Sequence, residues 1–151
     1  MEKISTEDIA NLNTVWEPPK NKKPIVMIGA GGIVSDAHLP AYKKANFPVR
    51  GIYDPDVEKA KKCAENYSIE KIYSSEEEAL AEKDVVFDIA VPPQVLLGIV
   101  EKIPNNSICQ LQKPMGNSMT QAKRIKEIIN EKNIIALSLI HISEPTRPLY
   151  I

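Results

Sequence analysis

Short apolar runs alternate with segments of helical periodicity along residues 24–136. The runs suit strands that are covered on both faces, and the segments between them repeat apolar residues every three or four positions. We expect strands at 25–28, 49–53, 72–73, 85–91 and 108–111, and a sixth that opens at 134–136. This alternation is typical of an α/β fold, a doubly wound parallel sheet with helical crossovers.

Helix starts are marked by capping residues. Asp56 precedes a periodic segment and is expected to cap it. Ser75 with Glu78, and Ser118 with Gln121, have the spacing of a capping box, in which the cap and the third helical residue satisfy each other's backbone. These signals place helices directly after the second, third and fifth strands.

Composition excludes several classes of protein. The 151 residues fit one domain, and 19 basic against 20 acidic residues give a net charge of −1, with no general attraction to nucleic acid or anionic lipid. No apolar run is long enough for a transmembrane helix, and the acidic, polar start is unlike a signal peptide. Cys63 and Cys109 lack metal-ligand spacing and are interpreted as buried, reduced thiols. We expect a cytoplasmic protein without nucleic-acid or membrane partners.

Two end segments are set apart from the expected domain at 24–136. Residues 1–23 form an N-terminal extension. Residues 137–147 read LSLIHISEPTR, which resembles the translation of a transposon-end sequencing adapter, so 137–151 are expected to be a non-native tail. The alternative is a genuine strand followed by a proline-rich end. On the adapter interpretation the natural protein continues past Ala136, and His141 has no functional weight.

The glycine turn after the first strand predicts dinucleotide binding. Gly29 permits a tight turn, Gly31 lets the backbone approach a pyrophosphate, and the following helix directs its positive end at the phosphates. Gly32 and Ile33 complete the expected cofactor-binding turn. Val34 stands where a third glycine or alanine is usual, which predicts wider helix–strand packing. The turn makes the expected fold Rossmann-like.

Asp54 ends the second strand about 20 residues after the turn, where a carboxylate can accept hydrogen bonds from the adenosine ribose. It would repel a 2′-phosphate, so we expect NAD rather than NADP. Arg50 and Lys59 lie close enough in sequence to accommodate a phosphate. The simpler interpretation of Asp54 is a turn residue before Pro55.

His38 lies in the first helical segment, two residues before Pro40. We interpret the histidine as structural. Proline inside a helix removes a hydrogen bond, so the helix is expected to kink or break there.

Lys113 follows the fifth strand and precedes Pro114. This position puts it at the carboxyl edge of the sheet, where open parallel sheets bind ligands. Standing alone, the residue would be an ordinary surface lysine before a turn.

Together with the glycine turn, Asp54 and the segment 90–93, Lys113-Pro114 resembles the Gfo/Idh/MocA family of oxidoreductases over residues 24–136. The resemblance covers the N-terminal nucleotide-binding half of that family. It implies NAD(P)-dependent hydride transfer on a sugar, inositol or related polyol, by a full-length protein that forms homo-oligomers.

The resemblance also implies roles for particular residues. Lys113 matches the lysine of the family's Glu-Lys-Pro motif, a catalytic residue that contacts the substrate and polarises its reacting oxygen. Val91, Pro92 and Pro93 match the turn that lines the nicotinamide side of the cofactor. Gln112 replaces the usual glutamate, which keeps a hydrogen-bond acceptor and removes a charge.

Other features depart from the family pattern. Leu96 stands where many members carry a histidine. The family's histidine acid/base, most of its substrate pocket and its oligomer interface belong to a C-terminal α/β domain, which would lie beyond Ala136 and is expected to be missing. We therefore expect this chain to bind cofactor without turning over substrate.

Two other functions fit part of the pattern. A non-catalytic dinucleotide-sensing domain that regulates a partner would use the same glycine turn. A methyltransferase also uses a glycine turn and an acidic residue after the second strand, but Ile33 and Lys113-Pro114 argue against it.

Overall fold

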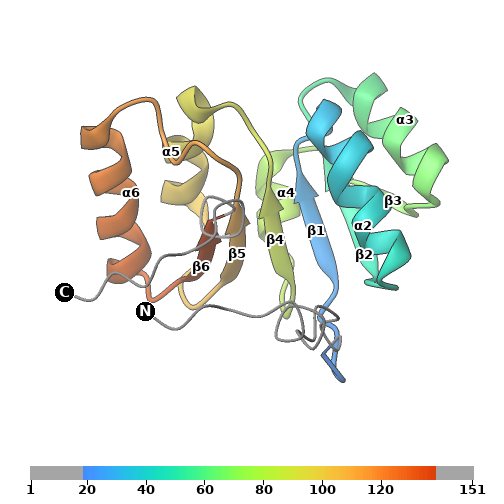
Figure 1. The fold of residues 1–151 in the computed structure, drawn as a ribbon, viewed down its shortest axis with the longest axis horizontal. Helices are drawn as coiled ribbons and strands as arrows, with labels where there is room; N and C mark the ends of the chain where they lie inside the picture. Colours follow the sequence, from blue (N-terminus) through green and yellow to red (C-terminus); the bar gives the residue numbers. More distant parts are fainter. Residues whose placement is uncertain (1–18, 139–151) are drawn as a thin grey trace, which may run out of the picture.

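The computed structural model describes residues 19–138, which form a sheet flanked by helices (Figure 1). The strands are β1 (Ile25–Ile28), β2 (Val49–Tyr53), β3 (Lys71–Ile72), β4 (Val86–Ile89), β5 (Ile108–Leu111) and β6 (Ile135–Ser138). The helices are the π-helical turn η1 (Val34–His38), α2 (Leu39–Lys44), α3 (Val57–Tyr67), α4 (Glu76–Leu80), α5 (Pro93–Lys102) and α6 (Met119–Glu131).

The sheet confirms the expected Rossmann-like fold. Its six strands are all parallel and follow the order β3-β2-β1-β4-β5-β6. The chain moves outward in one direction from β1 to β3 and in the other from β4 to β6, so the order reverses between β1 and β4. In such sheets ligands bind outside the carboxyl ends of the strands at this reversal.

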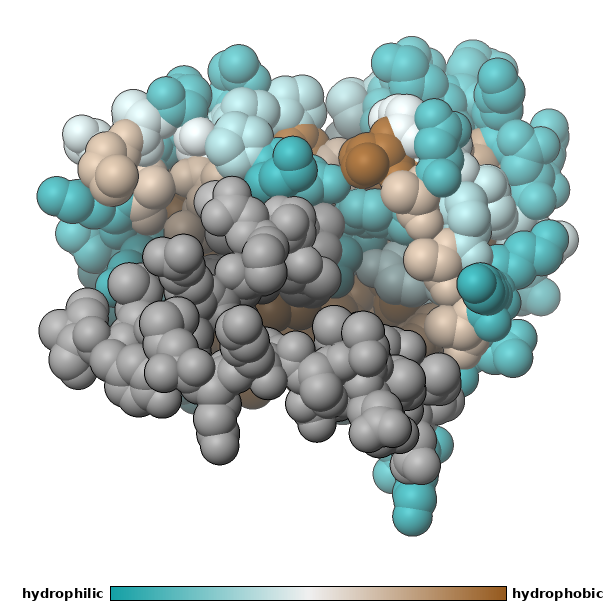
Figure 2. Space-filling view, in the orientation of Figure 1, coloured by the Kyte–Doolittle hydropathy of each residue, from teal (hydrophilic) through white to brown (hydrophobic). Residues whose placement is uncertain are grey.

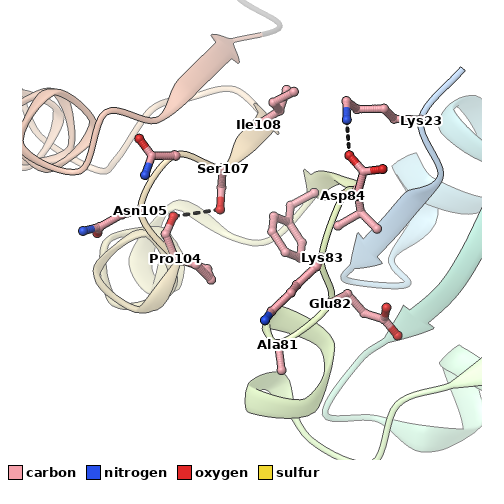
Figure 3. Close-up of a pocket in the computed structure, with 12 residues that line it drawn as sticks. Lys23, Ala81, Glu82, Lys83, Asp84, Pro104, Asn105, Ser107 and Ile108 are labelled. Carbon is pink, nitrogen blue, oxygen red and sulfur yellow. Dashed lines mark hydrogen bonds and ion pairs between the residues drawn. The ribbon is translucent and has the colours of Figure 1, made fainter. Parts of the chain in front are cut away.

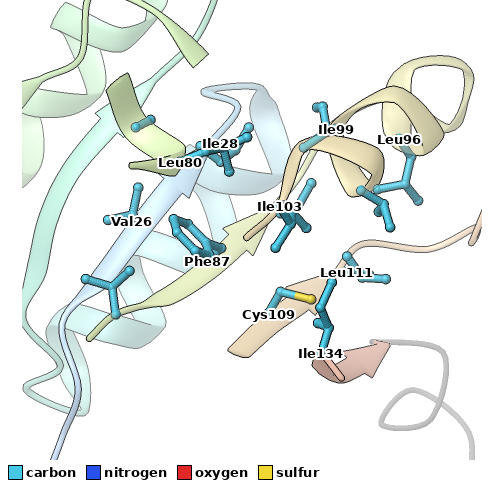
Figure 4. Close-up of a cluster of buried hydrophobic side chains, with 14 of the residues drawn as sticks. Val26, Ile28, Leu80, Phe87, Leu96, Ile99, Ile103, Cys109, Leu111 and Ile134 are labelled. Atoms are coloured by element: carbon cyan, nitrogen blue, oxygen red, sulfur yellow. The ribbon is translucent and has the colours of Figure 1, made fainter. Parts of the chain in front are cut away.

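Each face of the sheet carries its own core. One core lies between the sheet and α4, α5 and α6; its fully buried members include Val26, Ile28, Phe87, Ile89, Leu96, Ile103, Leu111 and Ile125 (Figure 4). The other lies beneath η1, α2 and α3; it includes Ile25, Met27, Ala30, Val34, Leu39, Ile52 and Ala60. Alternate residues of β1 belong to opposite cores, as the two-residue period of a strand requires. Outside these cores the surface over α3 is mainly hydrophilic (Figure 2).

The three predicted helix caps are confirmed. The side chains of Asp56, Ser75 and Ser118 each accept a hydrogen bond from the third residue of the helix that follows. In both capping boxes the reciprocal bond is displaced by one residue: Glu78 accepts from the backbone N–H of Ser74 at 2.8 Å, and Gln121 from that of Asn117 at 2.7 Å. The boxes therefore fix the residue before the cap as well as the helix itself.

Three strands have limits that differ from the expected ones. β3 lies at 71–72 because its residues pair with Gly51 and Ile52. β4 ends at Ile89, where its ladder with β5 ends, and does not reach 91. β6 begins one residue later than expected and continues to Ser138, two residues past the boundary expected at 136. β6 is held by backbone pairing with β5, which can form whether or not residues 137 and 138 belong to the expected non-native tail.

The helix after β1 is interrupted at the place that Pro40 predicts. The π-helical turn ends at His38, and α2 then begins with Pro40 in its first turn. In the π pattern the Ser35 carbonyl would pair with the N–H five residues on, which is the proline. The hydroxyl of Tyr67 on α3 donates to this carbonyl at 2.6 Å instead. A side chain thus replaces the backbone donor that proline lacks.

The two cysteines are free and buried, as expected. Burial raises the pKa of the Cys109 thiol to about 12, so it stays protonated at neutral pH. Within residues 19–138, none of the helices has the length and apolar character that crossing a membrane requires.

Gly29→Ala should destabilise the domain strongly, because residue 29 has φ +107° and a Cβ there would lie 2.3 Å from the carbonyl oxygen of Ala90. We expect a loss of about 2 kcal/mol or more in the free energy of unfolding, measured by urea denaturation. Gly98→Ala is the matched control, since a Cβ on this α5 residue meets nothing within 4 Å. It should raise stability by roughly 0.5–1 kcal/mol. Equal effects of the two substitutions would contradict this account of Gly29.

Candidate functional site

A cavity of about 500 Å³ opens at the carboxyl ends of β1, β2 and β4, where the strand order reverses. Its walls come from the end of β1 with the glycine turn, the end of β2, the segment 90–92 and one side of α5. Val95 and Ile99 supply the apolar wall from α5, and Lys59 and Glu76 add charged groups. The size and mixed lining suit a nucleoside moiety.

The glycine turn is held from both sides. The N–H of Gly29 donates to the carbonyl of Tyr53 at 2.7 Å, and the next strand approaches so closely that only glycine fits. Gly31 also lines the cavity, and a Cβ there would meet no protein atom within 4 Å. Packing within the domain therefore does not require glycine at 31, and the backbone there is open to the cavity.

Asp54 lies directly against this turn. Its Oδ2 accepts a hydrogen bond from the backbone N–H of Ala30 at 2.7 Å, and its Oδ1 accepts one from the N–H of Asp56 at 2.8 Å. The carboxylate also lines the cavity. Each carboxylate oxygen has a second lone pair and can accept a further hydrogen bond from a ligand.

The remaining residues of the predicted turn lie beside the cavity. Gly32 and Ile33 are exposed and do not line it. Val34 is fully buried and opens the π-helical turn. The structure thus brings Gly29 and Gly31 together with the Asp54 carboxylate. Gly32 and Ile33 lie at the rim of the cavity.

The segment after β4 forms the opposite wall. Val91 and Pro92 line the cavity, and Pro93 is the first residue of α5, a position where its missing N–H costs no helical bond. Leu96 is buried in the core against the sheet. The side chain at position 96 therefore contributes to core packing and presents no polar group to the site.

Lys113 and Gln112 lie one strand farther along the same edge of the sheet. Gln112 donates its N–H to the carbonyl of Ile89 at 3.0 Å, which fixes the end of β5 against β4. The Lys113 side chain is exposed, and the peptide bond to Pro114 is cis. Neither residue lines the cavity, although both lie at the same edge of the sheet.

Sequence reasoning missed a polar cluster beneath this edge. Asp88 on β4 is fully buried, and its Oδ2 lies 2.7 Å from both Nδ1 of His38 and the hydroxyl of Tyr42. Burial and the neighbouring carboxylate raise the pKa of Tyr42 well above its usual range. Gln110 and Gln112 extend the cluster along β5. The available signal was a charged residue inside the otherwise apolar strand Val86–Ile89.

A second cavity, of about 410 Å³, lies at the amino ends of the strands, between Lys23, the turn at 81–85 and the turn at 104–108 (Figure 3). Lys23 pairs there with Asp84, and the Ser107 hydroxyl donates to the Pro104 carbonyl. No residue of the predicted site lines this cavity. In the part of the chain from 19 to 138, no group of three or more acidic, histidine or cysteine side chains is placed to hold a metal ion.

Solved structures with the same fold include several oxidoreductases. An oxidoreductase from Thermotoga maritima matches with a TM-score of 0.70 and 20% identity over 77% of this chain and 37% of its own. A 3-ketoreductase from Actinomadura kijaniata, in complex with TDP-benzene and NADP, matches with a TM-score of 0.68 and 18% identity over 83% and 40%. The WlbA dehydrogenase from Chromobacterium violaceum, in complex with NADH and UDP-GlcNAcA, matches with a TM-score of 0.69 and 17% identity over 83% and 37%.

The chain thus spans roughly two fifths or less of these proteins. Comparison with curated protein sequences gives no match. A family model described as an oxidoreductase family with an NAD-binding Rossmann fold matches residues 23–141, which include every element that forms the cavity and its edge. The chain belongs to the Gfo/Idh/MocA family of oxidoreductases, and the matched residues are its NAD-binding Rossmann domain.

Proposed function

We propose that this chain is the cofactor-binding part of an oxidoreductase and that it binds NAD in the cavity at the reversal of strand order. The observation that carries the proposal is the contact between the Asp54 carboxylate and the glycine turn, 2.7 Å from Oδ2 to the Ala30 nitrogen. One fixed anion and one bare backbone turn lie side by side, as ribose and pyrophosphate recognition together require. Gly29, Gly31, Gly32 and Ile33 would surround the phosphates.

NAD is favoured over NADP by the charges at the rim. A 2′-phosphate would lie against Asp54 and near Asp56, the cap of α3. Lys59 is the cation that lines the cavity, but its ammonium lies 3.3 Å from the Asp56 carboxylate and is partly neutralised by it. Arg50 pairs with Glu82 at 3.2 Å and is also engaged. Both cations are thus paired with protein carboxylates.

The reaction we propose is transfer of a hydride between the nicotinamide and a carbon that bears a hydroxyl or carbonyl group, on a sugar or polyol. Bound NAD would supply the hydride acceptor or donor. The nicotinamide would lie against Val91, Pro92 and Pro93. Lys113, at the adjacent part of the sheet edge, would hold the reacting oxygen of the substrate. The UDP-GlcNAcA ligand of the WlbA dehydrogenase supports a sugar-like substrate. The rest of the pocket, the acid/base and the oligomer interface would come from the remainder of a full-length protein.

Asp54→Ala should weaken NADH binding by the chain about 10- to 100-fold, because it removes hydrogen bonds to a charged acceptor. It should also reduce the preference for NADH over NADPH, because the repelling charge is gone. Fluorescence titration with each cofactor measures both effects. Glu58→Ala is the control: this exposed carboxylate of α3 pairs with Lys61 and does not line the cavity. Unchanged affinities for both cofactors in Asp54→Ala would remove the role assigned to this carboxylate.

Lys113→Ala should leave NADH affinity within about twofold and abolish turnover in the full-length enzyme, where a single positioned group contributes about 10²–10⁴-fold. Steady-state kinetics and cofactor titration on the same variant separate the two effects. Lys123→Ala, at an exposed position of α6, is the surface control. Turnover that survives in Lys113→Ala would make the lysine structural. A chain that binds NADH but whose full-length form oxidises or reduces no sugar or polyol would favour the sensing domain.

A further inference from the structure

Five polar side chains connect the core of the domain to the turn that carries Lys113. His38 and Tyr42 both contact Oδ2 of the buried Asp88, and Gln110 donates to the Tyr42 hydroxyl at 3.2 Å. On its other side His38 Nε2 lies 3.2 Å from Nε2 of Gln112. The Oε1 of Gln112 accepts the backbone N–H of Lys113 at 2.7 Å.

The direction of these bonds determines where the imidazole proton lies. A backbone N–H can only donate, so the Gln112 atom that meets it is the carbonyl oxygen. The amide nitrogen of Gln112 therefore donates toward His38, and Nε2 of His38 accepts. The proton of a neutral imidazole is then on Nδ1, where it is donated to Asp88. Each donor in the series meets an acceptor only when His38 is neutral.

The far end of this series is fixed in the core. Asp88 is fully buried, and the two donors on Oδ2 come from the helical segment that spans η1 and α2. Because the pKa of Tyr42 is raised by burial and by Asp88, its hydroxyl keeps its proton and remains a donor. The imidazole is 8% exposed and cannot turn toward water without breaking its bond to Asp88.

We propose that neutral His38 is a positioning residue for Lys113 and acts through Gln112. This inference rests on the function proposed for Lys113. Glutamine at 112 is what selects the neutral imidazole, because its amide provides one acceptor for the Lys113 N–H and one donor for His38. A glutamate has no donor and would require a second proton on the imidazole. Gln112 and the imidazole that it contacts are 74 positions apart in the sequence.

Two isosteric half-replacements of His38 test the proposal in the 151-residue chain. In His38→Gln the side-chain amide reaches the position of Nε2 and can still accept from Gln112. In His38→Asn it reaches only the position of Nδ1 and can still donate to Asp88. We expect hydrogen exchange of the Lys113 amide, followed by NMR, to be about tenfold faster in His38→Asn, as expected for losing one ordered hydrogen bond. In His38→Gln the exchange rate of the Lys113 amide should stay within about twofold of the wild-type rate. Equal exchange rates in the two variants would overturn the proposal.

The unmodified protein provides a second test that needs no substitution. Nitrogen-15 NMR of His38 at pH 7 should show the proton on Nδ1 and a bare Nε2, and in Gln112→Glu it should show protons on both nitrogens. A proton on Nε2 in wild type would overturn the proposal. Tyr42→Phe is the control, since it removes a donor to Asp88 and should lower stability without faster exchange at Lys113. NADH titration of each variant reports on cofactor binding separately, so the proposed function can fail while these results hold.

Discussion

The structure depends on how closely β1 and β4 approach each other at their carboxyl ends. The backbone of Gly29 lies so near the Ala90 carbonyl that no side chain fits, and Ala90 in turn donates its N–H to Ile28 at 2.9 Å. This contact brings together the two halves of the sheet where the strand order reverses. The glycine turn, the Asp54 carboxylate and the segment after β4 can therefore share one cavity, although the sequence separates them widely.

Local signals were sufficient for most of the architecture. The predicted limits of β1, β2 and β5 match the structure, and each strand is followed within three residues by a glycine or a proline. Asp56, Ser75 and Ser118 were recognisable because a cap interacts with atoms only three residues away. The ends of β4 and β6 were less predictable, since pairing with β5 decides where each ladder stops and no single residue marks it.

The site was predictable only where a motif carries its own geometry. The glycine turn and Asp54 belong to one βαβ unit, so their proximity follows from right-handed crossover connections. The cluster around Asp88 does not follow from any motif. His38 is 50 residues from Asp88, and Gln112 is 74 from His38, and which polar side chain meets which depends on helix rotation and strand register. A carboxylate inside an apolar strand signals that a partner exists and leaves the partner's identity open.

The hydroxyl of Tyr67 on the Ser35 carbonyl has a mechanical consequence. The Ser35 carbonyl accepts its hydrogen bond from Tyr67 on α3 and not from its own helix. If α3 slid along the sheet, this carbonyl, in the segment that begins at the glycine turn, would lose its donor. One hydrogen bond thereby links the two helical segments. Substitutions on the buried side of α3 would then be felt at the mouth of the dinucleotide cavity, even though none of the altered atoms reaches it.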